Sequence, residues 1–79
     1  MAGTFNDTNE GSYTKRFDYD GSGNILYAGL AAPGTASSAA AWAIRRYTYV
    51  GANLVLVDWA GSNNSLVNVW NDRAALQYG

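Results

Sequence analysis

A side-chain period of two is the feature of this chain that most restricts its fold. Residues 13–19 and 42–50 both alternate in this way, and Tyr13, Phe17 and Tyr19 share one side of the first stretch. One side of the second stretch carries Trp42, Ile44, Arg46, Thr48 and Val50. This spacing suits an extended strand and not a helix, whose apolar face repeats every three to four residues. We therefore predict half-buried β-strands, with the aromatic side of residues 13–19 facing inward.

Each alternating stretch is followed by a turn and then by an apolar segment. Residues 20–24 read Asp-Gly-Ser-Gly-Asn and residues 51–53 read Gly-Ala-Asn. Gly and Asn accept the positive φ that tight turns require. We predict two β-hairpins, with residues 25–30 and 54–59 as their second strands.

The remaining segments complete a small all-β domain. Residues 31–41 contain Pro33-Gly34 and form a loop or one short helical turn, and residues 74–78 are expected to close the domain as a fifth strand. About five antiparallel strands with short turns are typical of a small barrel or sandwich. We assign this domain to residues 13–79. Residues 1–12 read as a polar N-terminal arm, which Phe5 fixes to its own domain or which a neighbouring subunit holds.

The interior of this domain must be small because the chain has only 79 residues. It contains no cysteine and no histidine, so disulfides and thiolate or imidazole metal sites cannot reinforce it. Three Trp, six Tyr and two Phe are the available apolar mass. The residues expected to form the core are Trp42, Ile44, Leu56, Trp59 and Trp70. We expect neighbouring subunits to supply further burial in a homo-oligomer.

Enzyme chemistry has few components here, and we expect no catalytic residue and no cofactor. Without histidine, a Ser, Thr or Tyr nucleophile would lack its usual base. Asp18 and Asp20 lie on one side of a strand end, where solvated charges are common. With Ser22 and Asn24 they loosely match the spacing of a calcium loop, but no closing acidic residue follows. A cation at this turn is left open, and no metal site is assigned.

Charge and aromatic residues favour a protein partner. Five basic and six acidic residues give a formal net charge of −1, whereas chains that grip phosphate backbones are normally basic. Tyr and Arg are enriched at protein interfaces. The candidate protein-binding residues are Phe5, Arg16, Arg45, Tyr47 and Tyr49. The alternative is a free binding module that stacks sugar or single-stranded nucleic acid on exposed aromatic rings.

The sequence predicts neither a membrane span nor an export signal. The longest stretch without a charge, residues 21–44, is interrupted by Asn24, by Pro33-Gly34 and by Ser37-Ser38. Residues 1–10 lack the basic and apolar regions of a signal peptide. We expect the chain to be made in a cytoplasm and not exported as a free protein.

Two groups of motifs resemble a pattern found in small uncharacterised proteins of tailed bacteriophages. The first group is Tyr19-Asp20, Gly23-Asn24, Tyr27-Ala28-Gly29, Ala32-Pro33-Gly34, Ser37 and Trp42-Ala43-Ile44-Arg45-Arg46. The second is Asp58-Trp59-Ala60-Gly61 followed by residues 69–78, Val-Trp-Asn-Asp-Arg-Ala-Ala-Leu-Gln-Tyr. The pattern usually carries an acidic residue before the glycine, where this chain has Ala60. The resemblance implies a virion structural protein, made in the host cytoplasm, that docks on capsid, neck or tail proteins.

Overall fold

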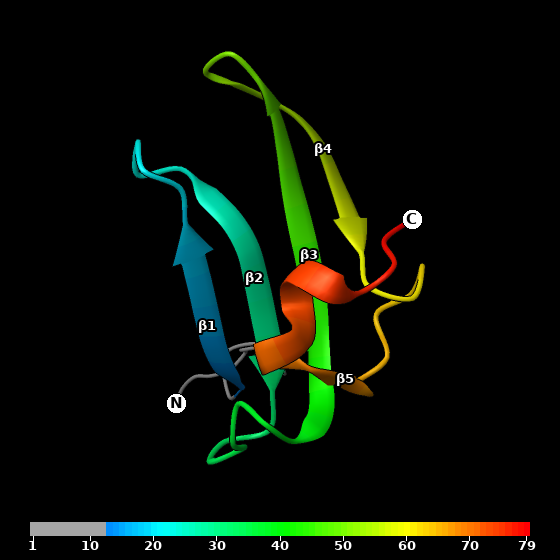
Figure 1. Cartoon of the computed structure of the whole chain (residues 1–79). Coiled ribbons are helices and arrows are strands. Elements are labelled where there is room, and N and C mark those ends of the chain that lie inside the picture. Colours follow the sequence, from blue (N-terminus) through cyan, green and yellow to red (C-terminus); the bar gives the residue numbers. More distant parts are fainter. Residues whose placement is uncertain (1–12) are drawn as a thin grey trace, which may run out of the picture.

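The computed structural model describes residues 13–79, which form one antiparallel sheet and a short 3-10 helix (Figure 1). The elements in chain order are β1 (Thr14–Tyr19), β2 (Ile25–Ala31), β3 (Ala40–Val50), β4 (Asn53–Trp59), β5 (Asn68–Val69) and η3 (Trp70–Ala75). Strands follow the order β1-β2-β3-β4, and β5 pairs with the start of β3. The five-stranded antiparallel all-β prediction is confirmed, and the sheet is not closed. The helix within residues 13–79 is too short to cross a membrane.

The first predicted hairpin is held by a carboxylate inside its turn. The Oδ1 atom of Asp20 accepts hydrogen bonds from the backbone N–H groups of Ser22 at 2.8 Å and Asn24 at 3.0 Å. The bond from Asn24, followed by that from Ser22, lowers the pKa of the Asp20 carboxyl. Gly23 takes a φ of +86°, which a glycine adopts without strain. The turn thus brings the two strands together so that Tyr19 pairs with Ile25.

The second predicted hairpin projects beyond the rest of the molecule. Gly51, with a φ of +60°, and Ala52 form its turn, and Val50 pairs with Asn53 on either side. β3 pairs with β2 only from Ala43 to Arg46, so the later part of β3 has β4 alone as a neighbour. The outer half of this hairpin extends as a two-stranded ribbon (Figure 1).

Residues 32–39 form the loop that the sequence left undecided, with no helix. Turn hydrogen bonds join Thr35 N–H to the Ala32 carbonyl and Ala39 N–H to the Ala36 carbonyl. The indole Nε1 of Trp42 donates to the Ala36 carbonyl at 2.9 Å, so the loop closes over the buried tryptophan. In an α-helix the Ala36 carbonyl would accept a hydrogen bond from the backbone N–H four residues later.

The fifth strand is not at residues 74–78, and this part of the prediction is wrong. It lies at Asn68–Val69, and the chain then turns into η3, leaving only Tyr78 in a bridge to Ala60. The reason is the Trp70 indole, which packs against β2 at Gly29. To place it there, the chain must pass over the sheet instead of along its edge.

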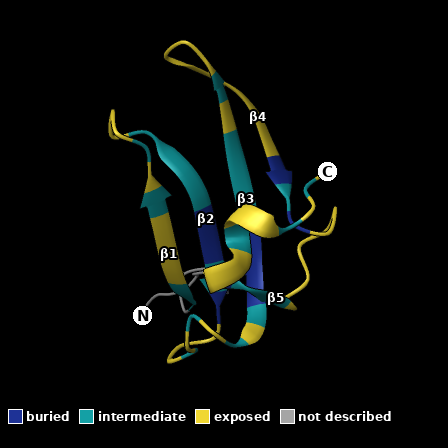
Figure 2. Cartoon of the chain, viewed as in Figure 1, coloured by how far each residue is buried: buried dark blue, intermediate teal, exposed yellow. Residues whose placement is uncertain are grey.

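Burial divides the sheet into two unlike faces. The covered face lies under η3 and contains the core, in which Trp42 and Ile44 are fully buried and Trp70 is 5% exposed. Figure 2 shows the buried residues concentrated in β2 and β3 close to η3, with the outer hairpin largely exposed. Because nothing in residues 13–79 covers that outer part, Leu56 is 49% exposed and does not belong to the core, contrary to expectation.

The aromatic side of β1 faces the opposite way from the prediction. Cross-strand pairs share a face, and Arg16 pairs with Gly29, which contacts the core residue Trp70. The covered side of β1 therefore carries Thr14, Arg16 and Asp18. Phe17 and Tyr19 lie on the other face, where they are 46% and 54% exposed. The alternation itself was predicted correctly, but the buried side was not.

Candidate functional site

The face of the sheet opposite η3 is called the open face below, and Phe17 and Tyr19 are exposed on it. A continuous cross-strand row runs over it from Phe17 through Ala28 and Arg45 to Trp59. A second row runs from Lys15 through Leu30 to Ala43. No helix of residues 13–79 lies over this face, but the loop after β4 reaches it through Asn64 and Leu66, and Ala28 and Ala43 are each only 2% exposed. Aromatic and aliphatic groups thus share this face with the Arg45 guanidinium and the Lys15 ammonium.

The open face contains a hollow of about 400 Å³. Its lining comes from β2, β3 and β4, from the residue before β1 and from the loop that follows β4. The lining residues are Tyr13, Leu30, Ala43, Arg45, Trp59, Asn64 and Leu66. Leu30 and Ala43 are apolar, and Arg45 and Asn64 supply hydrogen-bond donors. A mostly apolar concavity with a few polar groups is the usual form of a recognition site.

Arg45 and Trp59 form the centre of the open face. They are directly paired across β3 and β4, and the guanidinium of Arg45 lies 5.3 Å from the centroid of the Trp59 ring. Both residues are half-buried. A guanidinium over an indole is attracted by the electrons of the ring, which reduces the freedom of the long arginine side chain. The pair therefore presents a preorganised cation beside an apolar hollow.

The candidate protein-binding residues do not form one cluster. Arg45 and Tyr47 lie on the open face, whereas Arg16 lies on the covered side, 5.8 Å from the Trp42 ring centroid. The Tyr49 hydroxyl donates to the Ile25 carbonyl at 2.9 Å and so fastens the second hairpin to β2. Phe5 lies outside the described residues. Trp59, expected in the core, is instead half-buried at the hollow.

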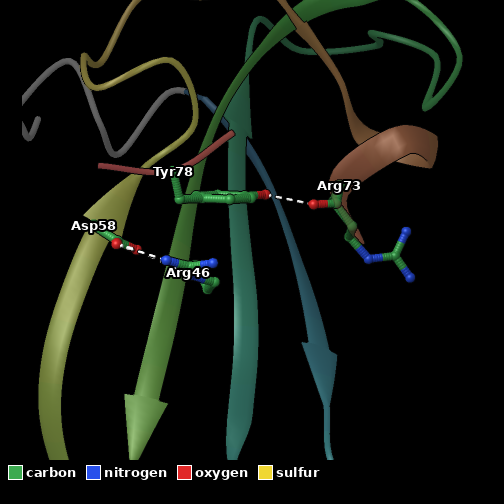
Figure 3. Close-up of polar contacts among 4 residues, drawn as sticks. All are labelled: Arg46, Asp58, Arg73 and Tyr78. Atoms are coloured by element: carbon green, nitrogen blue, oxygen red, sulfur yellow. Dashed lines mark hydrogen bonds and ion pairs between the residues drawn. The ribbon is translucent and has the colours of Figure 1, made fainter. Parts of the chain in front are cut away.

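Two ion pairs lie on the covered face, and one of them fixes the C-terminal segment. Arg46 binds Asp58 through two bonds, Nε to Oδ1 at 3.2 Å and Nη2 to Oδ2 at 2.9 Å, and this pair is visible in Figure 3. The carboxylate raises the pKa of the Arg46 guanidinium. Asp18 lies at the other end of the same cross-strand row, in β1, and accepts a hydrogen bond from Arg73 Nε at 3.1 Å. The first pair joins β3 to β4 within the second hairpin, and the second pair joins η3 to β1.

Tyr78 contacts both of the arginines in these ion pairs. Its hydroxyl donates to the Arg73 carbonyl at 2.7 Å (Figure 3), and its ring lies 4.8 Å from the Arg46 guanidinium. Burial raises the pKa of the Tyr78 phenol to about 12. The phenol is therefore a structural donor at neutral pH.

The acidic side chains considered for a cation have internal partners. Asp18 binds Arg73 and Asp20 binds the backbone of its own turn. Within residues 13–79 no three acidic side chains come together as a metal site. The polar groups of the covered face thus stabilise the fold, and the accessible chemistry lies on the open face.

Comparison of the chain with protein-family models, with curated proteins and with solved structures gave no match.

Several lining residues of the hollow were not singled out from the sequence. Tyr13 was read as a buried strand residue, and Leu66 lies in a stretch without a clear period. The alternation around Arg45 could have pointed to these residues, because side chains paired with Arg45 across the sheet must share its face. Of the three tryptophans, Trp42 and Trp70 are buried, and Trp59 is covered on one side by Arg45. Stacking of sugars or bases on free tryptophan rings has little support from this arrangement.

Proposed function

We propose that this chain is a structural protein of a tailed-phage particle that docks on other virion proteins through its open face. The particle context rests on the resemblance of the motifs at residues 19–46 and 58–78. The docking role is supported by one observation above all: the sheet face that carries Phe17, Arg45, Tyr47 and Trp59 is only partly covered by residues 13–79 and contains a hollow.

Apart from Lys15 on the β1 edge, the composition of the open face matches that of a protein interface core. Such cores are rich in aromatic residues and arginine and poor in other charges. Trp, Tyr and Arg also provide most residues whose truncation strongly weakens binding. At the hollow, the Arg45–Trp59 pair is surrounded by Tyr13, Leu30 and Leu66. A partner that fills the hollow with an apolar side chain would also meet a cation suited to a carbonyl or carboxylate.

The size of the core supports the same role. Burial is concentrated on the covered face, around Trp42, Ile44 and Trp70. A sheet with one packed face gains little from its other face until something covers it. Docking of the open face would bury that surface and stabilise the domain by mass action.

The test uses the phage that encodes the chain. Mass spectrometry of density-purified, nuclease-treated particles is expected to detect the chain in a fixed ratio to the major capsid protein. Leu66→Glu places a charge in the hollow and is expected to remove the chain from the particles. Val67→Glu is the matched control, because Val67 is adjacent, 61% exposed and not part of the hollow lining.

The two variants separate docking from folding. Both are expected to keep the circular dichroism spectrum of the native chain. Absence of the chain from purified particles would reject the virion role, and equal incorporation of both variants would reject the open face as the docking surface.

A further inference from the structure

The described part of the chain begins at the hollow of the open face. Tyr13, the first described residue, lines this hollow together with Arg45, Trp59 and Leu66. The N-terminal arm, residues 1–12, is therefore attached to the domain beside the hollow. A contact between the arm and the hollow needs no second molecule.

The arm is long enough to reach every part of the hollow. Neighbouring strands lie roughly 4.8 Å apart, so the three spacings from β1 to Trp59 in β4 amount to about 15 Å. Phe5 precedes Tyr13 by eight residues, and an extended chain of that length spans about 26 Å. The ring of Phe5 can thus be placed anywhere in the hollow.

The open face carries positive charge without acidic neighbours. The charged side chains that β1–β4 place on it are Lys15 and Arg45, and neither belongs to an ion pair within residues 13–79. The acidic residues of these strands, Asp18 and Asp58, lie together on the covered face. A segment that docks on the open face is therefore favoured if it is acidic.

The arm has the complementary chemistry. Its charged side chains are Asp7 and Glu10, and it contains no lysine or arginine, so the terminal amine is its only cation. Phe5 is its only aromatic residue. An aromatic ring followed by two carboxylates matches an apolar hollow that has a guanidinium beside it.

We propose that the N-terminal arm docks on the open face of its own domain, with the Phe5 ring in the hollow and its two carboxylates facing the two cations of this face. A hollow of about 400 Å³ accommodates one phenyl ring. A short covalent tether gives an effective concentration on the order of millimolar. The arm's own domain is therefore favoured over a second copy when the chain is at micromolar concentration.

Arm docking would regulate the surface assigned above to virion proteins. A partner reaches the hollow only by displacing Phe5, so free chains keep this surface covered before assembly. This consequence rests on the proposed function, whereas the arm contact itself does not. Absence of the chain from purified particles would reject the virion role and leave the arm contact, which is measured on the purified chain, unaffected.

Disulfide trapping in the full chain tests the contact. The chain has no cysteine, so the double variant Asn6→Cys with Asn64→Cys contains only two thiols, one next to Phe5 and one in the hollow lining. A disulfide requires the two Cα atoms to approach within about 7 Å. Mild oxidation at low protein concentration is expected to link the thiols within one chain, which keeps its mass near 8.4 kDa.

A third substitution in this double variant shows which side chain holds the arm. Phe5→Ser is expected to slow linkage by at least about tenfold, because burial of a phenylalanine side chain shifts an equilibrium by that factor or more. Phe17→Ser is the matched control, since Phe17 is an exposed phenylalanine of the open face outside the hollow lining, and linkage is expected to keep its rate.

The charges of the arm are tested in the same background. Asp7→Asn with Glu10→Gln is expected to slow linkage about twofold at low salt and to have no effect at high salt, where exposed charges are screened. An unchanged rate in the Phe5→Ser variant, or equal slowing by Phe5→Ser and Phe17→Ser, would overturn the proposal. Linkage mainly between two chains would also overturn it, because the arm would then lie on a second copy.

Discussion

At the residue scale, one glycine decides how the sheet is covered. A Cβ atom at Gly29 would lie 2.6 Å from Cε3 and 2.8 Å from Cζ3 of Trp70, and 3.1 Å from Cε3 of Trp42. Its lack of a side chain lets both indoles pack against β2, with ring centroids 6.0 Å apart. The core therefore requires a glycine here because of close approach and not because of a turn.

Gly29→Ala is expected to lower the free energy of unfolding by about 1–3 kcal/mol, because the methyl group displaces a buried indole. Gly21→Ala is the control, since a Cβ there meets nothing within 4 Å and the change should stay within about 0.5 kcal/mol. Urea unfolding followed by tryptophan fluorescence measures both. Equal stability of the two variants would contradict this view of the core.

Tyr78 gives the fold a pH dependence in the alkaline range. Its pKa is raised from 10.0 to about 12, so the folded chain keeps a proton that the unfolded chain releases. The resulting stability is fully present below pH 10 and is lost as the pH rises through about 12. We expect thermal stability to fall more steeply over this range in the native chain than in Tyr78→Phe. Parallel pH profiles would show that the phenol does not contribute.

At the element scale, the β3–β4 hairpin divides into an inner part and an outer part. The inner part, around Ile44, pairs with β2 and packs against η3, whereas the outer part has no strand pairing with β2 and contacts it through the Tyr49 hydroxyl. A ribbon of two strands is only marginally stable without such support. Its outer part is therefore expected to open more readily than the inner part.

Hydrogen exchange at low protein concentration should reveal this division. Amides of residues 53–56 are expected to exchange faster than those of residues 43–46, because local opening breaks only the hairpin's own bonds. Uniform protection along β3 and β4 would contradict this expectation.

At the scale of the whole molecule, stability depends on very few residues. The buried cluster consists of Ala31, Trp42, Ile44, Ala60 and Trp70, with Tyr27, Leu76 and Tyr78 packed against it. Small domains have total stabilities of only about 0.05–0.15 kcal/mol per residue. Loss of one large side chain from this cluster can thus remove most of the stability.

Trp70→Ala is expected to cost about 3–5 kcal/mol and to leave the chain largely unfolded at room temperature. Trp59→Ala is the comparison, because Trp59 is half-buried on the open face and its loss should cost less. Circular dichroism with thermal unfolding separates the two. A cooperative transition near the native temperature in Trp70→Ala would show that η3 is not needed for folding.

The local features of the fold could be predicted from the sequence because they depend on neighbouring residues. Alternation at residues 42–50 and the turn at residues 20–24 place both hairpins with small errors at their ends. The missing cysteine and histidine restrict the chemistry without any structure. Arg45 and Tyr47 could be chosen as contact residues because their type favours interfaces.

The tertiary structure decided which face of the sheet is buried. A period of two defines two faces, but nothing local says which one another element will cover. That choice follows from Trp70 packing on Gly29, a contact between residues 41 positions apart, which turned residues 70–75 into a helix over one face. It left Leu56 exposed, placed Trp59 at a hollow, and made the aromatic side of β1 a surface, because packing of distant segments and not alternation determines burial.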